Sequence, residues 1–203
     1  MAIKNIVFDV GNVLVKWNPE EITAKAFPDE PFPIKLSQRI FKSQIWYDLN
    51  LGKLTEAESI NIYNQQLGLS VEALKKMMDI LKDSLIPLDG SFELLEEIYN
   101  LGIPLYSITD NVKEIVSFLK TKYNFFDKFI GVAISAHIGV LKPCEKIYQY
   151  LLDRYQLVPQ DTVFIDDLHA NVEGARMVGM KGIHFSDAAS CRNELKRLGV
   201  LGL

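Results

Sequence analysis

Short apolar runs that end at polar residues are the feature that most constrains the fold of this chain. The run Ile3–Phe8 ends at Asp9 and then turns through a glycine. Later apolar runs end at Thr109 and at the adjacent pair Asp166 and Asp167. In an open parallel sheet, ligands bind along the edge formed by the carboxyl ends of the strands. The pattern therefore predicts that these polar side chains meet at one edge of a sheet.

Most of the chain alternates such runs with segments of helical spacing. Five apolar runs resemble buried strands: Ile3–Phe8, Ile103–Ile108, Phe129–Ile134, Val163–Ile165 and Ile183–Phe185. Helical spacing is found at Ser91–Leu101, Val112–Lys122, Cys144–Tyr155, Asn171–Val178 and Ser190–Leu198. Strands that alternate with helices and are apolar throughout indicate an α/β fold, with a parallel sheet covered by helices on both faces.

Residues 17–87 follow a different pattern, because they contain helical spacing but no strand-like run. The helical segments are Glu20–Phe27, Pro33–Phe41, Thr55–Leu67 and Val71–Leu81. Thr55 and Glu58 have the spacing of a capping box, Gly68 is placed to end that helix, and Ser70 is placed to cap the next one. We therefore predict an α/β core of residues 1–16 and 88–203, with a small all-helical insert of residues 17–87 after the first strand.

Composition narrows the class of protein. The chain has 203 residues, of which 48% are hydrophobic, enough for one domain with an insert. Its net charge of −4 argues against nucleic acid as a partner, since binding to phosphate backbones favours a basic surface. No apolar run approaches the ~18 residues of a membrane span, and no secretion signal is evident. With two distant cysteines, the expectation is a reduced cytoplasmic protein that binds no membrane. The oligomeric state is left open.

The carboxylates suggest phosphate and metal chemistry, and each also has a simpler interpretation. Asp9 is placed to attack phosphorus and form an aspartyl-phosphate, or merely to end a strand. The negative charges of Asp166 and Asp167, side by side at the end of a buried strand, cost free energy unless a positive charge lies near them. Mg²⁺ is the natural candidate because it prefers oxygen ligands. The alternative is a turn in which one of the two acids points to solvent.

Two further segments predict phosphate binding. Gly11 lacks a Cβ atom, so its amide and that of Asn12 are candidates for an anion-binding nest. Thr109 and Asp110 precede a helix, where a phosphate is well placed, although both residue types are also common helix caps.

Lys142 is the candidate cation for this site. It is followed by Pro143, which is expected in the first turn of a helix. Its ammonium group is suited to neutralise a phosphoryl oxygen and a neighbouring carboxylate together. The simpler interpretation is a solvated surface lysine.

Taken together, these residues resemble the four motifs of the haloacid dehalogenase superfamily. The matching segments, in chain order, are Phe8–Val13, Thr109, Lys142–Pro143, and Phe164–Asp167 with Asn171. The resemblance covers about two thirds of the chain and implies a Rossmann-like, doubly wound parallel sheet. The helical insert is similar to the helical cap of this superfamily, and the stretch from Tyr47 to Thr55 resembles its sugar-phosphatase-like members.

The resemblance also implies roles for these residues. Asp9 would be the nucleophile, assisted by Lys142 and Thr109. Mg²⁺ would be held by Asp9, the carbonyl group of Gly11, Asp166 and Asp167. The substrate would be bound by Gly11, Asn12, Thr109, Asp110 and Lys142. The implied reaction is hydrolysis of a phosphomonoester of a small metabolite, with a sugar phosphate favoured, through an aspartyl-phosphate.

The chain departs from the family pattern at three positions. Phosphatases of the superfamily usually have a second aspartate where this chain has Gly11. That aspartate protonates the leaving alcohol, so water, a substrate group, Asp110 or Asp167 is expected to replace it. Lys16 and Asn171 also stand where acids are common in the family, and the loss of negative charge is expected to weaken metal binding.

Three other functions compete with a phosphatase. A catalytically weak or inactive phosphate-binding regulatory member of the fold is supported by Gly11. A haloacid dehalogenase would use Asp9 without a metal, so the acidic pair argues against it. A phospho-accepting signalling domain would carry its acidic pair before the acceptor, which is the reverse of the order here. Trp17, Trp46 and Tyr47 are expected at the mouth between insert and core, where aromatic side chains more often serve packing than recognition.

Overall fold

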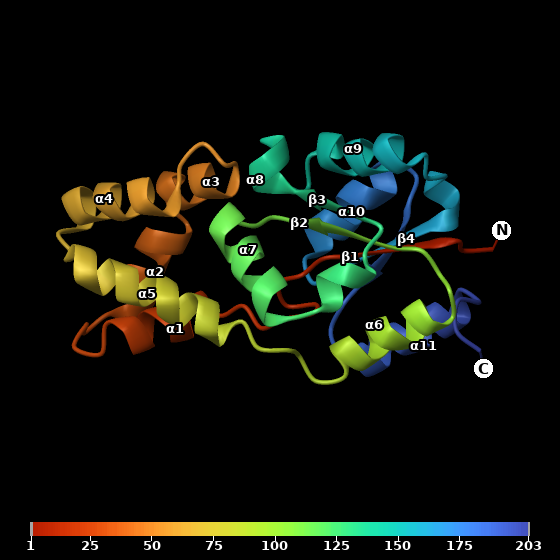
Figure 1. Ribbon diagram of the computed structural model, residues 1–203, viewed down its shortest axis with the longest axis horizontal. Coiled ribbons are helices and arrows are strands. Elements are labelled where there is room, and N and C mark those ends of the chain that lie inside the picture. Colours follow the sequence, from red (N-terminus) through yellow and green to blue (C-terminus); the bar gives the residue numbers. More distant parts are fainter. Residues whose placement is uncertain (1, 203) are drawn as a thin grey trace.

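The computed structural model describes residues 2–202 and has a five-stranded parallel sheet at its centre (Figure 1). The strands lie in the order β3-β2-β1-β4-β5. Their bounds are β1 Asn5–Phe8, β2 Leu105–Thr109, β3 Gly131–Ile134, β4 Thr162–Asp166 and β5 Lys181–His184. After β3 the chain crosses to the other side of β1, which creates a switch point between β1 and β4. The predicted α/β, doubly wound parallel sheet is confirmed.

Helices cover both faces of this sheet (Figure 1). On one face, Val7 of β1 shares a core cluster with Ile147 of α9 (Glu145–Tyr155) and with α10 (His169–Met177). On the other face, Ile6 shares a cluster with residues of α6 (Ser91–Asn100) and α11 (Ala188–Arg197). Adjacent residues of β1 thus point to opposite faces, as the pleat of a strand requires. The part of the chain after α6 also contains α7 Lys113–Lys122, η1 Phe125–Lys128, α8 Ser135–Ile138 and η2 Pro159–Asp161.

Five helices between β1 and α6 form the other end of the molecule, drawn from orange to yellow in Figure 1. They are α1 Pro19–Ala26, α2 Pro33–Phe41, α3 Gln44–Asn50, α4 Glu56–Leu67 and α5 Val71–Ser84. Their interior is apolar and includes Tyr63, whose hydroxyl donates to the carbonyl oxygen of Ile40 at 2.9 Å. We call residues 17–87 the helical cap. That they form a separate domain stays a prediction.

Most local signals in the sequence correspond to the observed helix ends. Thr55 and Glu58 form the capping box, Gly68 ends α4 with φ of 70°, and Ser70 caps α5. Helix α3 was not predicted, because its seven residues are too few to show a helical period. Pro143 is not in the first turn of a helix, since α9 begins only at Glu145.

Two segments connect the cap to the rest of the chain, and they are hydrogen-bonded to each other. The backbone N–H of Lys16 donates to the carbonyl oxygen of Ile86 at 2.8 Å, and that of Leu88 donates to Leu14 at 3.0 Å. The cap therefore leaves and rejoins the sheet along one short antiparallel pairing. No helix within residues 2–202 has the length and apolarity needed to cross a membrane.

The end of α3 is seated closely against α8. The hydroxyl of Ser135 donates to the carbonyl oxygen of Asn50 at 2.8 Å. Gly52 follows with φ of +70°, and a Cβ atom on it would lie 2.0 Å from the carbonyl oxygen of Ala136. Only glycine therefore allows the backbones of cap and core to approach this closely.

We expect Gly52→Ala to lower the free energy of unfolding by about 2–4 kcal/mol, because it adds a clash to an unfavourable backbone conformation. Gly68→Ala is the matched control, since Gly68 has the same φ and no atom within 4 Å of an added Cβ. Urea denaturation of the two variants measures the difference. Equal losses would show that the close contact between α3 and α8 does not form.

Candidate active site

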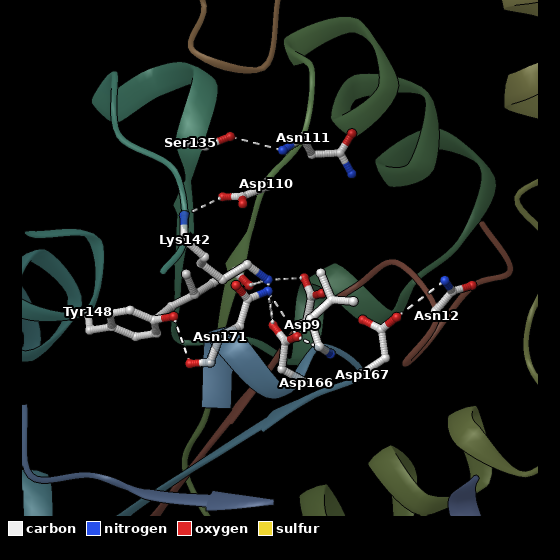
Figure 2. Close-up of polar contacts among 12 residues, drawn as sticks. Asp9, Asn12, Asp110, Asn111, Ser135, Lys142, Tyr148, Asp166, Asp167 and Asn171 are labelled. Carbon is white, nitrogen blue, oxygen red and sulfur yellow. Dashed lines mark hydrogen bonds and ion pairs between the residues drawn. The ribbon is translucent and has the colours of Figure 1, made fainter. Parts of the chain in front are cut away.

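Three carboxylates from the two central strands meet at one edge of the sheet (Figure 2). Asp9 follows β1 directly, Asp166 is the last residue of β4, and Asp167 comes next. One oxygen from each carboxylate lies within 4.8 Å of the others. Asp166 is fully buried, and the half-buried Asp167 accepts a hydrogen bond from Asn12 and lines the same site, so neither acid simply points to bulk solvent. The predicted convergence of these side chains is confirmed.

Lys142 lies between two of these carboxylates (Figure 2). Its Nζ atom is 2.8 Å from Asp9 Oδ1 and 2.7 Å from Asp166 Oδ2. The side chain is 1% exposed, which excludes the interpretation as a solvated surface lysine. A buried ion pair with both carboxylates holds the ammonium group within the site at the expense of its contact with water.

Asp166 is held in place by hydrogen bonds from the loop that follows it and from the first turn of α10. The Nδ2 atom of Asn171 donates to both carboxylate oxygens, at 3.0 and 3.1 Å, and the backbone N–H of Leu168 donates to Oδ1 at 2.8 Å. Tyr148 of α9 in turn donates its hydroxyl proton to the carbonyl oxygen of Asn171 at 2.8 Å. Asn171 therefore orients an acid. The sequence marked Asn171 as part of the fourth motif and as an uncharged residue where acids are common, but it did not indicate this orienting contact, and nothing in the sequence pointed to Tyr148.

Burial dominates the electrostatics of the site. It raises the pKa of Asp9 to about 8, against the opposing effect of Lys142 and with a smaller contribution from the charge of Asp166. Burial also raises the pKa of Asp167 and that of Asp110, the latter to about 6. Asp9, Asp110 and Asp167 thus lie near one positive charge, that of Lys142. Without a metal, their carboxylates bind protons more readily than free carboxylates do.

Thr109 and Asp110 do not cap the following helix. The residue before α7 is Val112, which makes no side-chain capping bond. Thr109 is almost fully buried at the end of β2. Asp110 lines the cavity described below and accepts a hydrogen bond from the backbone N–H of Lys142 at 3.1 Å. The N–H of Asn111 donates to Ser135 Oγ at 3.0 Å, so this amide is not free for a phosphate.

Gly11 and Asn12 are both at the site, but only one amide of the expected nest is available. The N–H of Asn12 donates to the carbonyl oxygen of Val15 at 2.7 Å, so the prediction for that amide was wrong. Asn12 adopts a left-handed conformation with φ of 52°. Its Nδ2 atom donates to Asp167 Oδ2 at 3.3 Å, and its Oδ1 atom accepts from the N–H of Trp17 at 2.9 Å. Asn12 therefore connects the acidic pair to the start of the cap.

A cavity of about 480 Å³ opens beside the carboxylates. Its walls come from both the cap and the core, and they include Asp9, Gly11, Asp110 and Lys142 on the core side. Trp17, Trp46 and Tyr47 line it on the cap side, as expected for the mouth between the two parts. The site is thus a concave pocket with charged groups at one end, the form that small-molecule sites take.

The donor set fits a divalent cation. Asp9, Asp166 and Asp167 offer carboxylate oxygens close together, which are the ligands that Mg²⁺ prefers. The raised pKa of Asp9 shows that Lys142 alone does not offset the burial of these acids. A second positive charge would complete the balance of charge at this edge of the sheet.

The chain thus has an α/β fold with a parallel sheet, and a buried carboxylate lies beside a lysine and two further acids at the switch point of that sheet. The model of the haloacid dehalogenase-like hydrolase family matches residues 3–179. The chain therefore belongs to this family and is a hydrolase.

Among curated proteins, the chain is 28% identical to the sesquiterpene phosphatase astK of Aspergillus oryzae, over 97% of both chains. Two solved structures share the fold. A predicted HAD-like family hydrolase from Porphyromonas gingivalis has a TM-score of 0.79 and 24% identity, with 98% of each chain covered. A HAD family enzyme from Bacteroides thetaiotaomicron, in complex with magnesium and inorganic phosphate, has a TM-score of 0.76 and 20% identity, with 90% of this chain and 93% of that chain covered.

Proposed function

We propose that this protein is a Mg²⁺-dependent phosphatase that hydrolyses small phosphomonoesters. The observation that carries the proposal is the position of Asp9. Its carboxylate lines the cavity, forms a salt bridge with Lys142 and lies beside two further acids. The similarity to a sesquiterpene phosphatase, and the magnesium and phosphate bound by a structural neighbour, support the same chemistry.

In this proposal the carboxylate of Asp9 attacks phosphorus, the bond from phosphorus to the ester oxygen breaks, and that oxygen takes a proton from water, Asp110 or Asp167 as the alcohol leaves. Water then attacks the phosphorus of the aspartyl-phosphate, and the bond to the Asp9 oxygen breaks, which releases inorganic phosphate and restores the Asp9 carboxylate. Lys142 neutralises negative charge on the phosphoryl oxygens, and Thr109 and the N–H of Gly11 bind them. Asp166 is held in its orientation by its contacts with Lys142 and Asn171.

Mg²⁺ would be held by Asp9, Asp166 and Asp167 with the carbonyl oxygen of Gly11. When bound, the ion would supply positive charge that stabilises the phosphoryl oxygens during transfer. The helical cap, residues 17–87, would close the outer side of the cavity. That arrangement favours small substrates over phosphorylated proteins.

The direct test is a phosphate-release assay over a panel of phosphomonoesters, with Mg²⁺ present and after its removal with EDTA. We expect release that depends on Mg²⁺ for at least one substrate. Tight Mg²⁺-dependent binding of phosphate analogues without any turnover would instead identify an inactive, regulatory member of the fold. Halide release from a 2-haloacid that EDTA does not affect would identify a dehalogenase.

Gly11 allows the missing general acid to be tested. A Cβ atom at this position would make only ordinary contact, 3.8 Å from Cβ of Trp17. We expect Gly11→Asp to fold and to change kcat by less than the ~10²–10⁴-fold typical of general acid catalysis, because Asp110, Asp167 or water already serves the leaving group. Gly11→Asn is the matched control without an ionisable proton. A gain of ~10²-fold or more for alkyl phosphates in the aspartate variant alone would show that no other group does so.

Binding of Mg²⁺ should depend on pH. The ion binds ionised carboxylates, and the pKa of Asp9 is raised to about 8, so protons compete with the metal below that pH. We expect the affinity to rise by up to about 10-fold per pH unit between pH 6 and 8, with proton release. Calorimetry in two buffers of different ionisation enthalpy measures both. An affinity that is constant over this range would contradict the proposed role of Asp9 as a ligand.

A further inference from the structure

The cap side of the cavity is an aromatic wall. The rings of Trp17 and Trp46 are stacked, with centroids 5.7 Å apart and planes inclined by 15°. Phe41 meets both rings edge-on, at 5.5 Å from Trp17 and 4.8 Å from Trp46. All three line the cavity, together with Tyr47, which is 49% exposed. We call these four side chains the aromatic wall.

The neutral polar side chains next to this wall are already committed to other protein groups. Ser43 donates to the carbonyl oxygen of Ile40 at 2.7 Å and accepts from the N–H of Trp46. Asn50 donates to the carbonyl oxygen of Trp46 at 2.8 Å. The Ser43 bond joins α3 to α2 and the Asn50 bond lies within α3, so the hydroxyl proton of Ser43 and one amide N–H of Asn50 are already used.

Besides the indole N–H groups and the Tyr47 hydroxyl of the wall itself, few polar groups remain for the part of a substrate that lies beyond the phosphate. Among the described residues that line the cavity, the charged ones are the carboxylates and Lys142 at the chemical end, and Lys42 on the exposed side. Asn111 uses its Oδ1 atom to accept from the N–H of Val112, which leaves its amide N–H groups. A polyol has a hydroxyl group on most carbons, and each hydroxyl that is buried without a partner costs free energy.

We propose that the alcohol portion of the substrate is apolar, either an aromatic ring or a hydrocarbon chain, in place of the sugar favoured by the sequence. This inference rests on the proposed phosphatase function. Phosphate is held at the end with Asp9 and Lys142, and the apolar portion lies against the aromatic wall. Burial of apolar surface against Trp17, Phe41 and Trp46 then supplies the selectivity.

The first test compares esters that have the same leaving-group chemistry. 2-Phenylethyl phosphate and n-octyl phosphate are the apolar substrates, ribitol 5-phosphate and glucose 6-phosphate are the polyol substrates, and methyl phosphate is the reference; all release primary alcohols. We expect kcat/KM for at least one apolar ester to exceed both polyol esters by 10-fold or more. The ring and the chain are separate arms that decide between the two apolar classes. Phosphate release with equal or greater kcat/KM for the polyols would overturn the inference and leave the phosphatase function intact.

The second test does not depend on activity. The chain contains two tryptophans, and both lie in the aromatic wall, so their emission reports on this cavity alone. We expect 2-phenylethanol or n-octanol to quench or shift the emission with saturation, and ribitol to have no effect at the same concentration. A response without phosphate release from any ester would support the apolar pocket while removing the phosphatase function. No response to either alcohol, or an equal response to ribitol, would overturn the inference.

A variant pair locates the effect. Tyr47→Ser removes an exposed ring of the wall, and Tyr150→Ser removes a ring of similar exposure (40%) from α9, outside the cavity. We expect the first change to lower kcat/KM for the preferred apolar ester by about 3- to 10-fold more than it lowers that for methyl phosphate. The second change should leave both values unchanged. An equal loss for methyl phosphate and the apolar ester in Tyr47→Ser would argue against selection by the wall.

Discussion

Asp9→Asn is expected to abolish phosphate release, with kcat lowered by about 10⁴-fold or more, as when other covalent nucleophiles are removed. The amide of asparagine cannot accept a phosphoryl group, although its shape matches that of the carboxylate. The measurement is phosphate release from the preferred ester at saturating Mg²⁺. Residual activity above about one per cent of the wild-type value would show that Asp9 is not the nucleophile.

Asp161→Asn is the matched control for this change. Asp161 also pairs with a lysine, since Lys4 Nζ lies 2.7 Å from its Oδ2, but it is remote from the cavity. The control should retain wild-type activity. Circular dichroism of both variants separates a chemical effect from unfolding. Loss of activity in both would indicate a general sensitivity to the removal of buried acids.

Lys142→Met is expected to lower kcat by about 10²–10³-fold, the range seen when one donor to a developing negative charge is removed. It also leaves Asp9 and Asp166 buried without their shared cation. The free energy of unfolding of the metal-free protein should fall by about 3–5 kcal/mol, the usual effect of removing one partner from a buried ion pair. Added Mg²⁺ should restore part of the stability but not the rate.

Lys128→Met controls for the loss of a lysine ion pair elsewhere. Lys128 pairs with Glu96 at 2.8 Å, and its side chain is 15% exposed. Urea denaturation with EDTA and with Mg²⁺ compares the two variants. A kcat for Lys142→Met within a few-fold of the wild-type value would contradict a role for this lysine at the phosphoryl group.

The fold was predictable because parallel strands that are buried on both faces consist of continuous apolar runs. That rule was enough to place the ends of the runs at Asp9 and Asp166 at one edge of a sheet, whereas the pairing of β1 with β4 came from the structure. The cap helices were equally visible from Thr55, Gly68 and Ser70, whose capping roles depend on residues within one turn. Helix α3 escaped because a segment of seven residues carries no reliable period.

The contacts within the site were less predictable, since they depend on pairs that are distant in sequence. Nothing near Lys142 showed that its ammonium group would be buried, so a solvated surface lysine was the simpler interpretation until the family resemblance was added. The amide of Asn12 was expected to face a phosphate, but a turn back to Val15 uses it. The commitment of Ser43 and Asn50 to the backbone of α2 and α3, which leaves the aromatic wall for the substrate, was also invisible in the sequence.

The central claim is that Asp9 both receives the phosphoryl group and shares a cation with Asp166 and Asp167. A crystal structure with Mg²⁺ and beryllofluoride, a mimic of the phosphoryl group, tests it directly. We predict beryllium bonded to a carboxylate oxygen of Asp9, and one Mg²⁺ about 2.1 Å from oxygens of Asp9 and Asp166. Beryllofluoride bound away from Asp9, or a metal bound without Asp166, would contradict the account.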